Sequence, residues 1–130
     1  MSIVSIVKCR DYTPKEVQAA LREAIGLAGL DGHLRDRKVL LKPNLLSARK
    51  PEDAVTTHPE VIRALGTIAA DGGCAVSVGD SPPFAGRNPE KYARLCEVTG
   101  IAQVARSLDV PLVRFESASK SIANAREGIY

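Results

Sequence analysis

The chain has 130 residues, of which 45% are hydrophobic and 25% are charged, and its formal net charge is +3. This balance is typical of one globular domain and argues against a disordered chain, and no apolar stretch approaches the ~20 residues of a transmembrane helix. The basic residues are scattered and only 4% of residues are aromatic, so nucleic-acid binding is not expected. We expect a single α/β domain over residues 1–130 with an aliphatic core.

The three cysteines, Cys9, Cys74 and Cys96, are too far apart for a C-x-x-C metal or redox motif. An odd number without paired spacing argues against a disulfide framework and for a reducing compartment. The first apolar run, residues 3–7, is too short for the core of a signal peptide. These features predict a cytoplasmic protein without a membrane partner.

Residues 2–9 read Ser-Ile-Val-Ser-Ile-Val-Lys-Cys, a β-branched run that predicts a first strand. A helix start follows, in which Thr13 caps, Pro14 occupies the first turn and Glu16 closes a capping box. Apolar residues at spacings of four, three and four then predict one buried helical stripe, made of Val17, Leu21, Ala24 and Ala28.

Residues 38–43 are the second predicted strand, which Pro43 ends because proline cannot donate to a sheet ladder. A second long helix is predicted to start at Thr57-His-Pro-Glu60 and to stop at Gly72-Gly73, since glycine accepts the left-handed conformation of a helix end. A polar loop connects the strand to this helix.

Residues 74–79 and 110–115 are the third and fourth predicted strands, and helical segments start near Asn88 and Ile101 between them. This alternation predicts a parallel sheet with right-handed crossovers. The expected fold is a three-layer Rossmann-like or flavodoxin-like sheet of about four strands with flanking helices. The polar tail after residue 117 indicates an incomplete domain.

Ligands of open α/β sheets bind outside the carboxyl ends of the strands, so the polar residues there are candidates for a site. Lys42 and Asn44 follow the second predicted strand; Lys42 either holds an anion or extends into solvent, and Asn44 either orients a ligand or stabilises its own turn. Asp80 and Ser81 follow the third strand. Asp80 either binds a hydroxyl, a metal or an amine, or caps the turn after it. Glu116 is either a second carboxylate for Mg²⁺ or a solvated side chain.

The start of the second long helix is a further candidate. Unpaired N–H groups at a helix N-terminus favour anions, and the hydroxyls of Thr56 and Thr57, together with Lys42, add to them. In the competing interpretation, Thr57 or His58 simply caps the helix. No second histidine lies at metal spacing from His58, and the standard phosphate-loop, dinucleotide and nucleophile motifs are absent from the sequence. No metal ligands are expected.

Three blocks of this sequence resemble domain of unknown function 362: Val39-Leu-Leu-Lys-Pro-Asn-Leu45, Thr56-Thr-His-Pro-Glu-Val-Ile-Arg-Ala-Leu65 and Val78-Gly-Asp-Ser-Pro82. They occur in the family's order and at similar separations. The resemblance covers residues 3–115 and implies that the chain is the N-terminal portion of a longer family domain. The motif positions it implies are Lys42, Asn44, Thr56, Thr57, Asp80 and Ser81, the same residues that strand ends and the helix start indicate.

Members of this family often carry ferredoxin-like cysteine clusters for 4Fe–4S centres. The resemblance therefore implies the N-terminal part of an iron–sulfur-associated enzyme or redox protein, which binds a small anionic substrate or cofactor at the rim of its sheet. This chain lacks those cysteine spacings, so we expect no cofactor within it and a 4Fe–4S cluster in a downstream segment. A ferredoxin-like module is the expected protein partner, and an oligomer is compatible with the sequence. The alternative is a non-catalytic binding module for an anionic metabolite or a partner protein.

Overall fold

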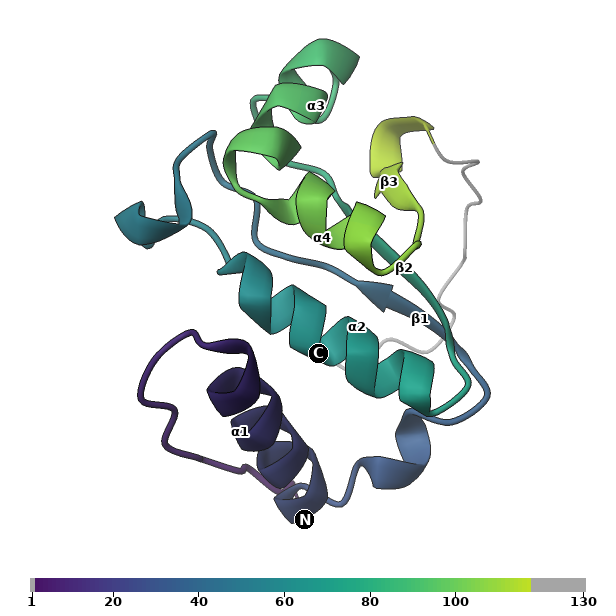
Figure 1. Ribbon diagram of the computed structural model, residues 1–130. Helices are drawn as coiled ribbons and strands as arrows, with labels where there is room; N and C mark the ends of the chain where they lie inside the picture. Colours follow the sequence, from purple (N-terminus) through teal and green to yellow (C-terminus); the bar gives the residue numbers. More distant parts are fainter. Residues whose placement is uncertain (1, 118–130) are drawn as a thin grey trace.

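The computed structural model describes residues 2–117 (Figure 1). In chain order the helices and strands are α1 (Pro14–Leu27), β1 (Lys38–Leu41), α2 (Pro59–Asp71), β2 (Ala75–Asp80), α3 (Pro89–Val98), α4 (Ile101–Ser107) and β3 (Leu112–Arg114). Short 3-10 turns lie at Asp31–His33, Pro51–Asp53 and Phe115–Ser117. Strands and helices therefore alternate from β1 onward, as the sequence predicts.

The three strands form one open parallel sheet in the order β1-β2-β3. Leu41 of β1 is in register with Val78 of β2, and Asp80 of β2 is in register with Arg114 of β3. Among the described residues the strands lie in sequence order, so this part of the sheet has no point at which strand order reverses. The prediction of about four strands is corrected to three strands within residues 2–117.

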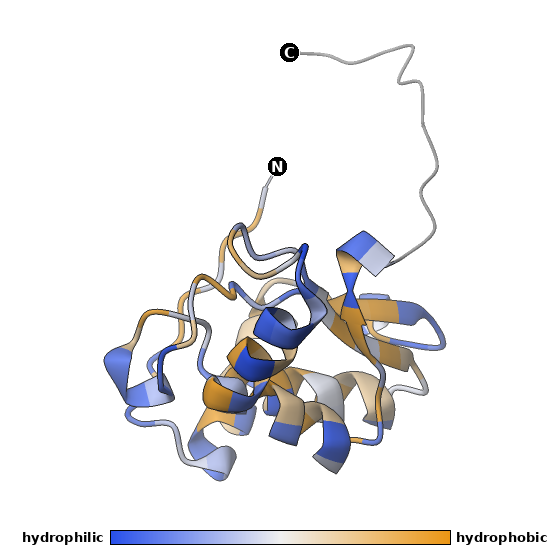
Figure 2. Ribbon diagram, turned by 90° about the horizontal axis from the view of Figure 1, so that it is seen from above, coloured by the Kyte–Doolittle hydropathy of each residue, from blue (hydrophilic) through white to orange (hydrophobic). Residues whose placement is uncertain are grey.

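The predicted first strand, residues 2–9, is wrong. This segment has no regular structure, and Ile3, Val4 and Ile6 are 66%, 82% and 91% exposed. Figure 2 shows its hydrophobic colouring next to the N label. β-branched residues favour an extended backbone, but a strand also needs a neighbour to share its hydrogen bonds. The described sheet supplies none to this segment.

Helix α1 begins where the sequence predicts, although its expected cap is wrong. The Thr13 side chain makes no capping hydrogen bond, and Glu16 pairs with the guanidinium of Arg10 instead of closing a capping box. Of the predicted apolar stripe only Val17 is buried, because α1 packs mainly beside α2 (Figure 1). The periodicity therefore predicts the helix correctly but overstates its burial.

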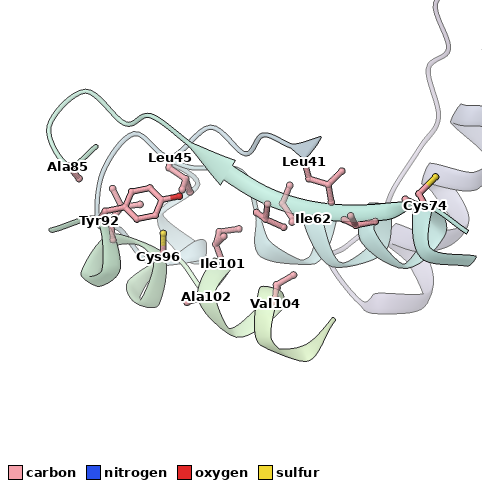
Figure 3. Packing of buried hydrophobic residues seen from close by; sticks show 14 residues of the cluster. Leu41, Leu45, Ile62, Cys74, Ala85, Tyr92, Cys96, Ile101, Ala102 and Val104 are labelled. Carbon is pink, nitrogen blue, oxygen red and sulfur yellow. The ribbon is translucent and has the colours of Figure 1, made fainter. Parts of the chain in front are cut away.

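The core lies between the sheet and the helices α2, α3 and α4. Side chains alternate along the strands, so that Val76 and Val78 are buried towards the helices while Leu40 and Ala75 are exposed on the opposite face. The described residues thus form two layers, and the second helical layer of the predicted three-layer fold is not among them. Figure 3 shows the buried cluster running from Cys74 at one end to Tyr92 and Ala85 at the other.

Candidate functional site

The carboxyl ends of the three strands share one edge of the sheet because the strands are parallel. We call this edge, formed by residues 42–45, 80–82 and 114–116, the carboxyl rim. Close packing of β2 and β3 at the rim requires Gly79, since a Cβ there would lie 2.4 Å from the carbonyl oxygen of Val113 and 2.9 Å from the ring of Phe115. The absence of a side chain at this position lets the ends of β2 and β3 converge.

Asp80 is the central residue of the carboxyl rim. Its side chain is only 5% exposed, and its Oδ1 lies 2.7 Å from the Nζ of Lys42. Its Oδ2 accepts a hydrogen bond of 3.0 Å from the backbone N–H of Leu45. A buried carboxylate is stable only when such partners replace its water. Asp80 therefore fixes both the loop after β1 and the ammonium group of Lys42.

Lys42 combines this fixed position with access to solvent. Its side chain is 58% exposed although its ammonium contacts a buried carboxylate. An ammonium has three N–H donors, so contact with one oxygen of Asp80 leaves donors for a ligand. The structure thus brings the predicted residues Lys42 and Asp80 together at the same edge of the sheet.

Asn44 and Thr57 connect the carboxyl rim to the start of α2. The backbone N–H of Asn44 donates to Thr57 Oγ1 at 2.8 Å, and the N–H of Thr57 donates to the carbonyl of Asn44 at 3.3 Å. Thr57 therefore does not cap the helix. Its neighbour Thr56 has a buried Oγ1 with no hydrogen-bond partner among residues 2–117.

His58 is the cap of α2, as one of the two sequence interpretations predicts. Its Nδ1 accepts from the N–H of Glu60 at 3.2 Å, and its carbonyl accepts from the N–H of Val61 at 3.1 Å. Burial lowers the pKa of His58, which favours the neutral ring that can accept this bond. Pro59 has no N–H, and the N–H groups of Glu60 and Val61 already donate to His58. An anion at this helix start would therefore depend on side chains.

Ser81 and Glu116 join the ends of β2 and β3. The hydroxyl of Ser81 donates to Glu116 Oε1 at 2.5 Å, so Glu116 is part of the rim and not merely a solvated side chain. Gly86 packs against the same carboxylate, where a Cβ would lie 2.2 Å from Oε1. The side chain of Arg114 donates to the carbonyl of Gly86 at 2.8 Å. These contacts hold the loop of residues 81–88 over the end of β3.

A hollow of about 570 Å³ opens beside this loop, and its lining residues are Ser81, Pro82, Pro83, Arg87, Phe115 and Glu116. Sequence reasoning did not single out Arg87 or Phe115. Their only signal is position: Arg87 directly precedes the predicted helix start at Asn88, and Phe115 is the last residue of a predicted strand. Once the sheet is assembled, Phe115 belongs to the rim and Arg87 lines the hollow beside it.

The residues described here do not fit an iron–sulfur cluster. Such clusters normally take four thiolates, and the sequence has three cysteines. Cys9 is exposed, whereas Cys74 and Cys96 are buried and stand well apart in the core, with Ile62 and Ile101 drawn between them in Figure 3. Burial raises the pKa of Cys96 to about 11, which keeps it a thiol at neutral pH. Residues 2–117 contain no group of three or more histidine, cysteine and acidic side chains that could hold a metal ion.

The fold and the rim together define an α/β domain with a polar edge at the carboxyl ends of a parallel sheet. The chain belongs to the family described as Domain of unknown function (DUF362), whose profile matches residues 39–128. That match contains every predicted site residue: Lys42, Asn44, Thr56, Thr57, Asp80 and Ser81.

The chain is also similar to "Thylakoid-associated protein sll1697" of Synechocystis sp. (strain ATCC 27184 / PCC 6803 / Kazusa). The two are 31% identical over 114 residues, which are 86% of this chain and 34% of that protein. The chain thus spans about a third of the length of this relative. No solved structure matches the chain. Within residues 2–117, none of the helices has the length and apolar character needed to cross a membrane.

Proposed function

We propose that this chain is the N-terminal part of an iron–sulfur-associated enzyme or redox protein, and that its carboxyl rim binds a small anionic substrate or cofactor. The observation that carries the binding proposal is the ion pair between buried Asp80 and exposed Lys42. A lysine whose ammonium is held in place loses less side-chain entropy when it binds an anion than a freely moving one.

The charge balance of the pair sets the expected affinity. Asp80 neutralises part of the charge of Lys42, so a simple anion gains only a modest Coulomb energy at this exposed position. Asn44 is exposed two residues after Lys42, and its side-chain amide can supply a further polar contact. We expect inorganic phosphate to bind weakly, with a dissociation constant on the order of 1–10 mM.

The binding proposal is tested by titrating inorganic phosphate and acetate into ¹⁵N-labelled protein while its amide signals are followed by NMR. Shifts should concentrate at residues 42–45, 56–57 and 80–81. Lys42→Ala should weaken binding at least threefold, whereas Lys38→Ala should leave it unchanged. Lys38 is a matched control because it is an exposed lysine at the opposite end of the same strand. Equal effects of the two substitutions, or no shifts at 20 mM phosphate, would mean that the Lys42–Asp80 pair serves the fold alone.

A non-catalytic binding module is the second candidate function, and one observation favours it. The polar groups of the rim are bonded to one another: Ser81 to Glu116, and Asp80 to Lys42 and the N–H of Leu45. Such an arrangement presents a rigid polar surface, which can bind a ligand without reacting with it. Recovery of a bound metabolite unchanged after long incubation would favour this candidate over an enzyme.

The iron–sulfur part of the proposal concerns the whole protein, with the cluster in a downstream ferredoxin-like segment and the cytoplasm as its compartment. It rests on the family membership, because the thiols of this chain do not form a cluster site. The full-length protein purified without oxygen should contain iron and sulfide in equal amounts, while the 130-residue chain should contain neither. If the full-length protein contains no iron, the iron–sulfur part of the proposal is wrong, and the binding proposal still stands.

A further inference from the structure

We infer that the ligand of the carboxyl rim is a nucleoside phosphate, with its phosphate at Lys42 and its base in the hollow between Phe115 and the loop of residues 81–88. This inference rests on the proposed anion site at Lys42 and adds the chemical class of the rest of the ligand.

The walls of the hollow suit a planar aromatic ring. Pro82, Pro83 and Phe115 provide apolar surfaces, and Arg87 provides a planar guanidinium group. Guanidinium planes and aromatic faces both stack on heterocyclic rings. The volume of about 570 Å³ lies within the range of small-ligand sites, which runs from roughly 300 to 1,000 Å³.

The polar edge of the hollow determines which end of the ligand it takes. Glu116 carries a negative charge beside the hydroxyl of Ser81, and both line the hollow. A carboxylate repels a phosphate but accepts hydrogen bonds from the N–H and amino groups of a nitrogen heterocycle. Arg87 adds a positive charge to the same hollow, so the assignment rests on its apolar walls and on the acceptor oxygens of Glu116, which suit the base, while the proposed anion site at Lys42 takes the phosphate.

The separation of the two subsites suits one molecule. Lys42 continues β1 and Glu116 follows β3, and β2 lies between those strands. Two strand spacings correspond to roughly 10 Å, which the sugar of a nucleoside phosphate can bridge. Asp80 contacts Lys42, and the next residue in the chain, Ser81, lines the hollow, so both subsites include the end of β2.

The hollow is held in shape by bonds within the loop. The N–H groups of Ala85 and Gly86 donate to the carbonyl of Pro82 at 3.3 and 2.8 Å, and Arg114 donates to the carbonyl of Gly86. Gly86 has no room for a side chain against Glu116. A preformed site loses little conformational entropy when a ring enters.

The test compares four probes by NMR titration: adenosine monophosphate, ribose 5-phosphate, adenosine and inorganic phosphate. Adenosine monophosphate should bind about tenfold more tightly than ribose 5-phosphate, because stacking of one base adds about that factor. Arg87→Ala and Phe115→Leu should each reduce this advantage at least threefold without changing phosphate binding. Arg94→Ala is the control, since Arg94 is an exposed arginine on α3 outside the hollow.

Equal affinity for adenosine monophosphate and ribose 5-phosphate would overturn the inference while leaving the anion site standing. The same holds if Arg87→Ala and Arg94→Ala have equal effects, because the base would then lie elsewhere. Failure of both phosphate and ribose 5-phosphate to bind would remove the proposed anion site itself. Binding of adenosine that is insensitive to Lys42→Ala, without binding of phosphate, would contradict the division into two subsites.

Discussion

At the carboxyl rim, polar side chains from one strand end contact the next, whereas residues 2–9 leave Ile3, Val4 and Ile6 exposed and pair with none of the described strands. Asp80 contacts groups on two other positions of the chain, Lys42 and Leu45. Ile6, in a segment of strong strand character, is 91% exposed. The difference shows that a local pattern becomes regular structure only where the fold supplies partners for it. Substitutions at the rim should therefore lower the free energy of unfolding more than substitutions in residues 2–9.

The largest effect is expected at the buried carboxylate. Asp80→Ala should lower the free energy of unfolding by about 2–3 kcal/mol, because the buried N–H of Leu45 loses a charged acceptor. Lys42→Ala removes the exposed partner of the same ion pair and should cost less, about 1 kcal/mol, because water can take the place of the exposed ammonium while the N–H of Leu45 still contacts the carboxylate. Urea unfolding of both variants measures the difference. Equal losses of unfolding free energy would show that Asp80 contributes no more to the stability of the fold than Lys42 does.

The close approach of β2 and β3 predicts the next effect. Gly79→Ala should cost about 1–3 kcal/mol, since its Cβ meets the carbonyl of Val113 at 2.4 Å. Gly32→Ala is the control, because a Cβ there meets no heavy atom within 4 Å. Thermal unfolding of the two variants compares them. If Gly79→Ala is as mild as Gly32→Ala, the two strand ends are packed more loosely than the structure shows.

A smaller loss is expected at the link between Asn44 and α2. Thr57→Val keeps the shape of the side chain but removes the acceptor of the Asn44 N–H, and should cost about 1 kcal/mol. Thr13→Val changes a threonine that also precedes a proline-initiated helix but makes no capping bond, so its unfolding free energy should be nearly unchanged. A loss at Thr13 as large as that at Thr57 would contradict the distinction between the two threonines.

The smallest effect is expected in the N-terminal segment. Ile6→Ser should change the unfolding free energy by no more than about 0.5 kcal/mol, as is usual for an exposed position. The same isoleucine-to-serine change at the buried Ile101 provides the contrast, with a cost of several kcal/mol. A loss above 1 kcal/mol at Ile6, on the scale of typical buried substitutions, would mean that this segment packs against the domain in solution.

Much of this arrangement could be predicted from local sequence signals. The family likeness rests on residues close together in the chain, and so do the strand ends near Pro43 and Asp80 and the helix starts at Pro14, Pro59 and Pro89. Such signals are enough to predict where elements begin and end, because proline and glycine determine the backbone conformation at their own positions. They also placed the candidate residues at the ends of parallel strands.

The features that sequence reasoning missed depend on residues far apart in the chain. Whether residues 2–9 form a strand depends on a neighbouring strand, and strand order depends on how the helices pack. The role of Thr57 is decided by Asn44, which lies thirteen positions away. Glu116 and Arg87 line one hollow only after β3 has paired with β2. A pattern of neighbouring residues in the sequence does not predict such contacts between distant residues.

Direct observation of the Lys42 side chain tests the central claim that the carboxyl rim binds anions. In protein labelled with ¹³C at the lysine ε-carbon, the ε-methylene signals of Lys42 and Lys38 can be assigned through the two lysine-to-alanine variants. On addition of inorganic phosphate the Lys42 signal should move and saturate, and the Lys38 signal should move little. Asp80→Asn, which neutralises the carboxylate beside the ammonium, should alter the saturation curve of Lys42 alone. Parallel, non-saturating movement of both lysines would contradict a site at the rim and indicate general screening of surface charge.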